Sequence, residues 1–432
     1  SHDLLTTFVN VSDGNHMGIS DCFIDEGVPY YRGQDAGAFF IENSNPICIN
    51  EKTFELPVMK RSHLKKGDVI LSIVGTIGSL SLVYSDKNAT CSCKLAILRP
   101  KEGKSAELLA TFLRGKYGQA QITRFTRGAV QKGLILEDMD QLVVPTFGDG
   151  IVEAIKNAVQ SAYQIQEKAN IHYREAQRTL MNSVGSILAP AESVSVRNIS
   201  TSFYTTGRLD AEYYQPKYDI LFDELKKFSC KRLGGPNGIV NIKKSIEPGS
   251  EAYTEDGIPF VRVSDISKFG ISEPDIKLRS DIIPNPEVLF PPKDTILLSK
   301  DGSVGIAYKV EATMPIITSG ALLHLKVRDK TEVLPDYLTL VLNSPVVQLQ
   351  AERDSNGAII QHWKPSEIEN VIIPILDMDT QKEIAAKVQE AFTLRKQSKQ
   401  LLEYAKQTVE MAIEQGEDVA LAWLKDKIPV EV

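Results

Sequence analysis

The chain has 432 residues, of which 42% are hydrophobic and 24% charged, proportions typical of a globular protein with two or three domains. No run of about 18 apolar residues occurs, which excludes a membrane-spanning helix. The five scattered cysteines indicate a reducing compartment, so we expect a cytoplasmic protein with structural thiols.

The net charge of −7 gives no sign of a nucleic-acid-binding protein, but the distribution of that charge does. Residues 60–132 contain 14 lysines and arginines against 4 aspartates and glutamates, whereas residues 293–364 contain 8 of each kind. Lysine and arginine displace the counterions that condense on DNA. We therefore predict that residues 60–132 face phosphates; a solvated basic surface is the alternative.

The predicted elements are short strands, each group followed by a helix. Ser1-His2, which stands where an initiator Met is expected, is interpreted as a processing remnant and left out. Strands are predicted at residues 69–74, 81–84, 94–98, 295–298 and 321–325, where apolar and β-branched residues lie between turn residues. Helices are predicted at residues 108–113 and 335–343.

A long helix is predicted after each group of strands. In the first, residues at spacings of 3 and 4 form a seam: Val152, Ile155, Val159, Ala162, Gln166, Ala169, Tyr173, Ala176 and Leu180. The same seam recurs near the C-terminus with the same spacings: Gln381, Ile384, Val388, Ala391, Arg395, Ser398, Leu402, Ala405 and Val409. A period of 3.5 is typical of paired helices, and one polar residue in such a seam fixes their register. Gln166 and Arg395 are therefore the predicted register residues. Two amphipathic helices that pack on separate cores are the alternative.

The whole chain is an internal repeat. Residues 26–32 recur as 256–262, and residues 141–145 recur as 370–374. The offset between matching segments stays nearly constant along the chain, so the chain holds two copies of one unit. The predicted organisation is a first copy (3–148), a helix (149–186), a linker (187–232), a second copy (233–378), a helix (379–416) and a C-terminal tail (417–432). The predicted fold class is α+β, with two repeated mixed α/β domains joined by two long antiparallel coiled-coil helices in a pseudo-two-fold arrangement.

Motifs for catalysis are missing. Gly75/Gly78 and Gly302/Gly305 follow strands and predict tight turns, but no Gly-Lys-Ser/Thr follows to make a nucleotide-binding loop. Phe290-Pro-Pro-Lys293 lacks the flanking residues of a methyltransferase target-base loop, and no carboxylate-plus-lysine set of a nuclease is complete. Neither the histidines nor Cys91-Ser-Cys93 have zinc-ligand spacing. We therefore expect no catalytic site and no metal in this chain.

Polar side chains on predicted loops are the candidate DNA-binding residues. In the first copy they are Arg32, Gln34, Arg61, His63, Lys65, Lys94, Arg124, Arg127 and Lys132. In the second copy they are Arg262, Ser264, Lys300, Asn356, Gln361, His362 and Lys364. Arg or Lys pairs with guanine and Asn or Gln with adenine in the major groove. Because corresponding loops differ, the two copies are suited to different half-sites; ordinary exposed polar groups are the alternative.

Four segments resemble type I restriction–modification specificity subunits: Leu71–Gly78, Arg208–Tyr214, Gly257–Asp265 and Asp301–Gly305. The resemblance covers nearly the whole chain. It implies two target-recognition domains that each read half of a bipartite site in double-stranded DNA, with the helix length setting the gap. It also implies DNA adenine methyltransferase subunits near the helices that hold S-adenosylmethionine, and it allows a restriction or translocase subunit.

One departure from the family pattern leaves alternatives open. Residues 208–225 have no counterpart before the first copy. Either the start of the first copy is a genuine start, or the chain was cut from a longer fused protein. The second hypothesis is therefore the DNA-recognition half of a fused type II methyltransferase–nuclease. A third is a coiled-coil scaffold that does not bind DNA, against which the basic stretch argues.

Overall fold

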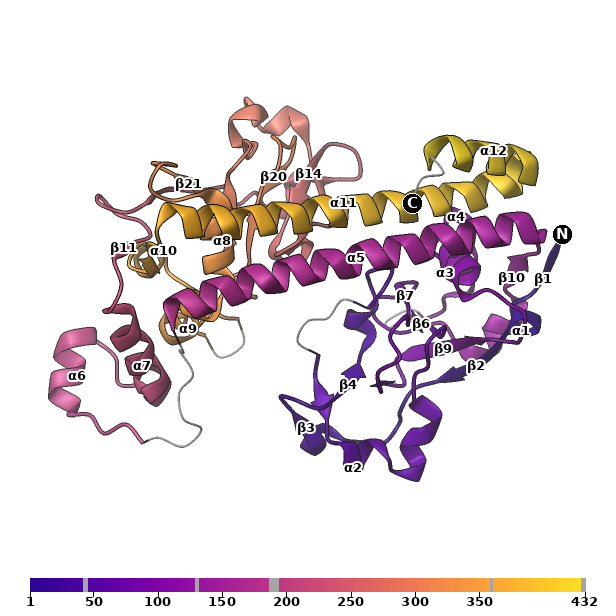
Figure 1. The fold of residues 1–432 in the computed structure, drawn as a ribbon, viewed down its shortest axis with the longest axis horizontal. Helices are drawn as coiled ribbons and strands as arrows, with labels where there is room; N and C mark the ends of the chain where they lie inside the picture. The colour runs from indigo at the N-terminus through magenta and orange to yellow at the C-terminus, as the bar shows by residue number, and fades with distance from the viewer. Residues whose placement is uncertain (42–45, 129–131, 186–193, 358–359, 429–432) are drawn as a thin grey trace. The chain divides into compact units, whose positions relative to one another are not determined.

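A computed structural model describes residues 1–41, 46–128, 132–185, 194–357 and 360–428 (Figure 1). The chain divides into two compact units. Unit 1 comprises residues 1–167 and 394–432, and unit 2 comprises residues 168–393. Each of the two long helices therefore contributes one part to each unit. No helix in the described ranges is long and apolar enough to cross a membrane.

Unit 1 is built on two small four-stranded sheets. The first is antiparallel, in the order β2 (Val9–Asp13), β9 (Leu95–Pro100), β6 (Val69–Ser72) and β7 (Leu80–Leu82). The second has the order β3 (Phe23–Ile24), β5 (Cys48–Ile49), β4 (Val28–Tyr31) and β8 (Thr90–Cys91), with β4 and β8 parallel. All four residues of β6 are buried, which explains its unbroken apolar sequence and places it in the core.

Unit 2 repeats both four-stranded sheets in the same strand order and adds a hairpin of β15 (Ile266–Ser267) and β16 (Gly270–Ile271). Its antiparallel sheet has the order β12 (Val240–Lys244), β21 (Leu322–Val327), β18 (Ile296–Ser299) and β19 (Ala307–Lys309). Its second sheet has the order β13 (Tyr253–Thr254), β17 (Lys277–Leu278), β14 (Ile258–Val261) and β20 (Ile317–Thr318), and again the last two are parallel. The repeat seen in the sequence is thus a repeat of the fold.

Two helices follow the antiparallel sheet in each unit, and matched glutamines attach them. They are α3 (Ala106–Arg114) and α4 (Lys116–Phe125) in unit 1, and α8 (Pro335–Leu342) and α9 (Pro345–Asp354) in unit 2. Gln121 of α4 exchanges two hydrogen bonds with the backbone of Val143, at 2.9 and 3.1 Å. Gln350 of α9 does the same with Ile372, at 2.8 and 2.9 Å. These bonds satisfy edge groups of β10 (Val143–Pro145) and β22 (Ile372–Pro374), which pair with β1 (His2–Leu4) and β11 (Cys230–Arg232).

The long helices α5 (Asp149–Val184) and α11 (Met378–Gln415) pack against each other inside each unit. In unit 1, Ser398 of α11 donates a hydrogen bond of 2.7 Å to the Ala162 carbonyl of α5. Just beyond the two helices, the Gly148 amide before α5 donates one of 2.9 Å to Glu417, the first residue of α12 (Glu417–Lys427). In unit 2, Thr179 donates to Glu383 at 3.3 Å, and Lys387 lies 3.8 Å from Glu175. Contacts that advance along α5 move backward along α11, so the helices are antiparallel in both units.

The predicted heptad seam is confirmed by its burial. Ile155, Val159 and Ala162 are fully buried in unit 1, and Ala176 and Leu180 are fully buried in unit 2. In the same seam Gln166 is 8% exposed and Arg395 is partly buried. Their role in setting register, like the pseudo-two-fold arrangement, stays a prediction.

Three further helices lie where we expected only a linker and a tail. They are α6 (Ile199–Thr206), α7 (Pro216–Leu225) and α12 (Glu417–Lys427). In α7, Tyr218, Leu221 and Leu225 are buried at spacings of three and four, which is why this short stretch is helical. His2, which we left out, pairs with Pro145 in the β1–β10 ladder.

Candidate nucleic-acid interface

In each unit a short loop closes on itself beside a glycine turn. Arg127 and Gly133 exchange backbone hydrogen bonds of 2.8 and 2.7 Å, and Gly133 also bridges Val74. In unit 2, Asn356 and His362 exchange bonds of 3.0 and 2.7 Å, and His362 bridges Asp301. We call residues 127–133 and 356–362 the bridged loops; 129–131 and 358–359 lie outside the described residues.

The glycine turns next to the bridged loops are tight, as predicted. Gly75 and Gly78 have φ of +81° and +87°, and Gly302 and Gly305 have φ of +73° and +87°. These left-handed conformations strain other L-residues. A Cβ at Gly78 would also lie 2.8 Å from the amide oxygen of Gln119, which holds the turn against α4. The turns therefore serve close packing and leave their outer edge free for side chains.

The bridged loop of unit 1 carries an exposed cation fixed by an internal carboxylate. Arg127, with a side chain 63% exposed, forms an ion pair with Asp138, whose side chain is 4% exposed. Asp138 lies on η4 (Leu136–Gln141). Its second oxygen, Oδ2, is buried and has no hydrogen-bond partner within the described ranges of the chain. Arg127 is therefore the group that compensates this buried charge.

The bridged loop of unit 2 carries a different arrangement. His362, 61% exposed, places Nδ1 2.8 Å from Asp301, which also forms an ion pair with Lys300. Burial raises the pKa of the Asp301 carboxyl, but hydrogen bonds from Lys300 and His362 outweigh it and leave the pKa below its ordinary value. Asp301 is therefore an ionised acceptor that orients the Lys300 ammonium and the His362 ring.

A second pair of arginines is the same in both units. Arg32 precedes η2 (Gly33–Asp35), and its backbone amide donates a hydrogen bond of 2.7 Å to Asp35. Arg262 precedes η7 (Val263–Asp265), and its amide donates one of 2.8 Å to Asp265. The two guanidinium groups are 38% and 40% exposed and lie 3.9 and 3.8 Å from those carboxylates. This shared placement suits a contact that both units make alike, such as one to phosphate.

The other predicted residues of unit 1 divide into exposed groups and groups used inside the unit. Gln34, Lys65, Lys94, Arg124 and Lys132 are exposed. Arg61, also exposed, forms an ion pair with Asp13. His63 stacks on the Phe54 ring at 3.7 Å and hydrogen-bonds the Phe54 carbonyl at 2.9 Å, so its ring serves local packing.

The charge count of residues 60–132 overstates the charge at the surface. Arg99 donates hydrogen bonds of 2.7 and 2.6 Å to Asp68, whose side chain is 1% exposed. Arg114 donates one of 2.7 Å to the Leu80 carbonyl, and its burial lowers its pKa. These two cations act inside the unit, so only part of the basic stretch can face phosphates, contrary to our prediction for the whole of it.

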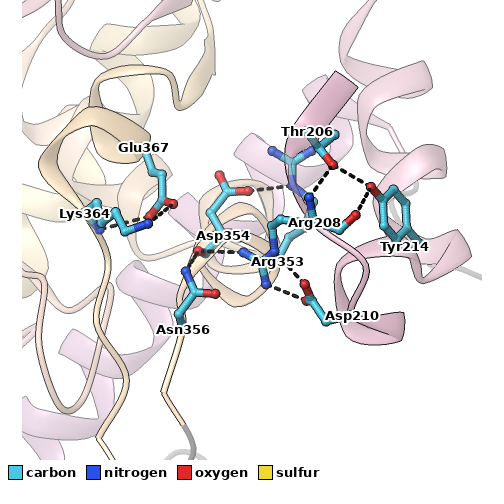
Figure 2. Close-up of polar contacts among 9 residues, drawn as sticks. All are labelled: Thr206, Arg208, Asp210, Tyr214, Arg353, Asp354, Asn356, Lys364 and Glu367. Atoms are coloured by element: carbon cyan, nitrogen blue, oxygen red, sulfur yellow. Dashed lines mark hydrogen bonds and ion pairs between the residues drawn. The ribbon is translucent and has the colours of Figure 1, made fainter. Parts of the chain in front are cut away.

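In unit 2, Figure 2 shows Asn356 and Lys364 among neighbours that restrain them. Asn356 donates a hydrogen bond of 3.1 Å to the Asp354 carbonyl, and the Lys364 ammonium lies 3.7 Å from Glu367. Ser264 donates to Asp265 at 3.0 Å, and Gln361 is exposed.

The segment before the second copy covers the end of α9 in unit 2 (Figure 2). Arg208 donates a hydrogen bond of 3.2 Å to the Asp354 carbonyl. The Arg353 guanidinium lies 5.0 Å from the Tyr213 ring and 4.3 Å from the Phe222 ring. Arg353 is the counterpart of Arg124 in the repeat, but it is covered where Arg124 is exposed. The sequence did not single out Arg353 or Asp138, and it gave Arg208 and Asp301 only within segments that carry the family resemblance. The constant offset between the copies could have pointed to Arg353.

Residues 236–404 match the family model described as the type I restriction modification DNA specificity domain. The chain is also similar to the S subunit of a type I restriction-modification system from M. genitalium, with 16% identity and a TM-score of 0.36 over 100% of this chain and 96% of that one. It is similar to the HsdS subunit from Thermoanaerobacter tengcongensis, with 15% identity and a TM-score of 0.32 over 96% of this chain and 97% of that one. No curated protein matches. The family model covers the second copy, and the internal repeat relates the first copy to it.

Proposed function

We propose, from the premise that residues 236–404 are a type I restriction modification DNA specificity domain, that the chain is a DNA-reading subunit in which each unit recognises half of a bipartite site. One observation carries this proposal: two units with the same strand order and the same helix attachments present different exposed side chains on their bridged loops. A protein that reads two different half-sites with one scaffold needs this combination of shared interior and altered edge.

The chemistry is assigned to a partner. The chain lacks a methyltransferase target-base loop, and no group of three or more His, Cys, Asp and Glu that could hold a metal occurs in the part of the chain that the structure describes. We assign methyl transfer to DNA adenine methyltransferase subunits that carry S-adenosylmethionine, in a cytoplasmic complex that a restriction or translocase subunit could join. This chain would supply the sequence specificity.

Unit 1 and unit 2 would contact DNA with two kinds of group. Arg32 and Arg262, placed alike in the two units, are suited to phosphate contacts, which position a protein without reading sequence. Arg127, Asn356, Gln361 and His362 differ between corresponding positions and are suited to base edges.

The test is co-expression of the chain with a DNA adenine methyltransferase subunit of a type I restriction–modification system, followed by sequencing that detects modified bases. We expect N6-methyladenine in one motif of two specified parts separated by a gap of unspecified bases. Methylation or cleavage by the chain alone would contradict the proposed division of roles. A complex that assembles but neither binds DNA nor forms such a motif would favour the scaffold hypothesis.

A further inference from the structure

In the two bridged loops, the side chain that a carboxylate holds stands at different positions of the same backbone pair. The backbone pair is Arg127 with Gly133 in unit 1 and, at the matching positions of the repeat, Asn356 with His362 in unit 2. In unit 1 the cation stands at the first position and the second is glycine. In unit 2 the first position is a neutral amide, and the side chain that a carboxylate holds, the His362 imidazole, stands at the second.

The carboxylate that contacts this side chain also stands at a different position in each unit. Asp138, which holds Arg127, corresponds to Glu367, which pairs with Lys364 instead. Asp301, which holds His362, corresponds to Val74, which has no charge. Neither carboxylate has an equivalent role in the other unit.

Each pair compensates a carboxylate that would be costly to bury alone, but this requirement does not explain why the exposed partner differs between the units. The carboxylate is the more buried member, with Asp138 4% and Asp301 24% exposed, and its partner is more than 60% exposed. An ion pair with so exposed a member contributes little beyond that compensation. The arrangement fixes the direction of an exposed side chain, which a reading contact requires.

We infer that Asp138 and Asp301 are specificity-determining positioning residues, which aim Arg127 and His362 at one base pair in each half-site. This inference rests on the proposed function. It also states which base each unit selects there, because the Arg127 guanidinium and the His362 imidazole offer different hydrogen-bonding groups.

Arg127 keeps guanidinium N–H donors beyond the one used on Asp138, and such donors match the O6 and N7 acceptors of guanine. His362 must donate from Nδ1, because the ionised Asp301 only accepts. In the neutral ring Nε2 is then an acceptor, and it matches the exocyclic amine of adenine or cytosine. Unit 1 therefore reads guanine at this position, and unit 2 reads an amine-bearing base.

The experiment measures base selection by the complete methyltransferase complex, with wild type, Asp138→Asn and Asp301→Asn compared by modified-base sequencing. Asparagine keeps the shape of each carboxylate and removes its charge. We expect Asp138→Asn to lower discrimination about tenfold at one base pair of one half-site, and Asp301→Asn to do the same in the other half-site. Glu224→Gln is the matched control and should leave the motif unchanged, because Glu224 is 26% exposed and pairs with the 62% exposed Lys227 outside the bridged loops.

Two further variants keep the test decisive if a buried change impairs folding. Arg127→Ala and His362→Ala remove the exposed groups themselves and should relax the same two base pairs. A purely structural defect would weaken binding to all sites equally, so the readout is the preference at a single base pair.

The outcomes separate this inference from the proposed function. Absence of any bipartite motif with the wild-type complex would refute the proposed function. A bipartite motif that Asp138→Asn and Asp301→Asn leave equally stringent, or that both variants relax in the same half-site, would overturn the inference alone.

Discussion

Unit 1 and unit 2 share their interior packing but differ in the side chains exposed on their bridged loops. Gln121 and Gln350 attach equivalent helices to equivalent strands, and Arg32 and Arg262 are held in the same way. The bridged loops on these matched interiors differ in which residue carries charge and which carboxylate holds it. The comparison teaches that packing constrains the interior of the two copies alike, while the exposed edge can change without altering the fold.

A second difference concerns what covers the helix after the antiparallel sheet. In unit 2, Tyr213 and Phe222 lie over Arg353 at the end of α9. In unit 1 the corresponding Arg124 is exposed. The arginine at this position of the repeat therefore has a packing role in unit 2 and is exposed in unit 1.

The largest effect expected concerns acid, which should destabilise unit 2 more than unit 1. Burial, followed by the nearby Lys243, lowers the pKa of His324 to about 4. An unfolded histidine titrates near 6.5, so the unfolded state binds more protons between these values and stability falls as the pH falls from about 6.5 to 4, by roughly 3 kcal/mol. The counterpart in unit 1 is Ile97, so His324→Ile should abolish this loss. Urea unfolding of the full chain, followed by Trp363 fluorescence at pH 7 and pH 4.5, measures it.

A pH dependence of unit 2 that survives His324→Ile would contradict this assignment. Trp423 lies in unit 1 and reports its unfolding in the same experiment. Its transition should be the same in wild type and variant.

A smaller effect is expected from the matched glutamines. Gln350→Ala leaves the amide and the carbonyl of Ile372 without partners and should cost about 2–3 kcal/mol, because Gln350 is almost fully buried. Gln121→Ala should cost about 1–2 kcal/mol, since this side chain is only partly buried and water can replace it. Urea midpoints, followed by the tryptophan of each unit, give both values. A larger loss in unit 1 would show that the attachments are not equivalent.

The smallest effect per residue concerns the salt dependence of DNA binding. Replacing Arg124 and Lys132 with Ala should reduce the slope of log affinity against log salt by about 0.9 for each lost phosphate contact. Arg353→Ala, the covered counterpart of Arg124, is the control and should not change the slope. Binding of the assembled complex to duplex DNA at several salt concentrations measures it. Equal slopes for the double variant and wild type would mean that these residues face away from phosphates.

The sequence predicted those features that depend on local pattern or on the repeat. The buried strand β6, the helices α3 and α8, the seam of α5 and α11 and the glycine turns all follow from spacing and composition. Helices α6, α7 and α12 were missed because each is short. Helices α7 and α12 bury apolar residues, whereas α6 buries none.

Partnerships between distant residues were also beyond the sequence. Asp301 meets His362 across 61 positions, and only the β-bridge between them brings the two together. Counting charges along the chain likewise placed Arg99 and Arg114 at a surface, although tertiary structure turns both toward internal acceptors.

The central claim, that the units are one scaffold with exchangeable reading edges, is tested most directly by converting one edge into the other. The variant Asn356→Arg, His362→Gly, Asp301→Val and Glu367→Asp gives unit 2 the residues of unit 1 at the backbone pair of the bridged loop and at the two carboxylate positions. Modified-base sequencing of the methyltransferase complex should then show the second half-site selecting guanine at the converted base pair, with the first half-site unchanged. An unchanged second half-site in an active complex, or a change in the first half-site, would contradict the account.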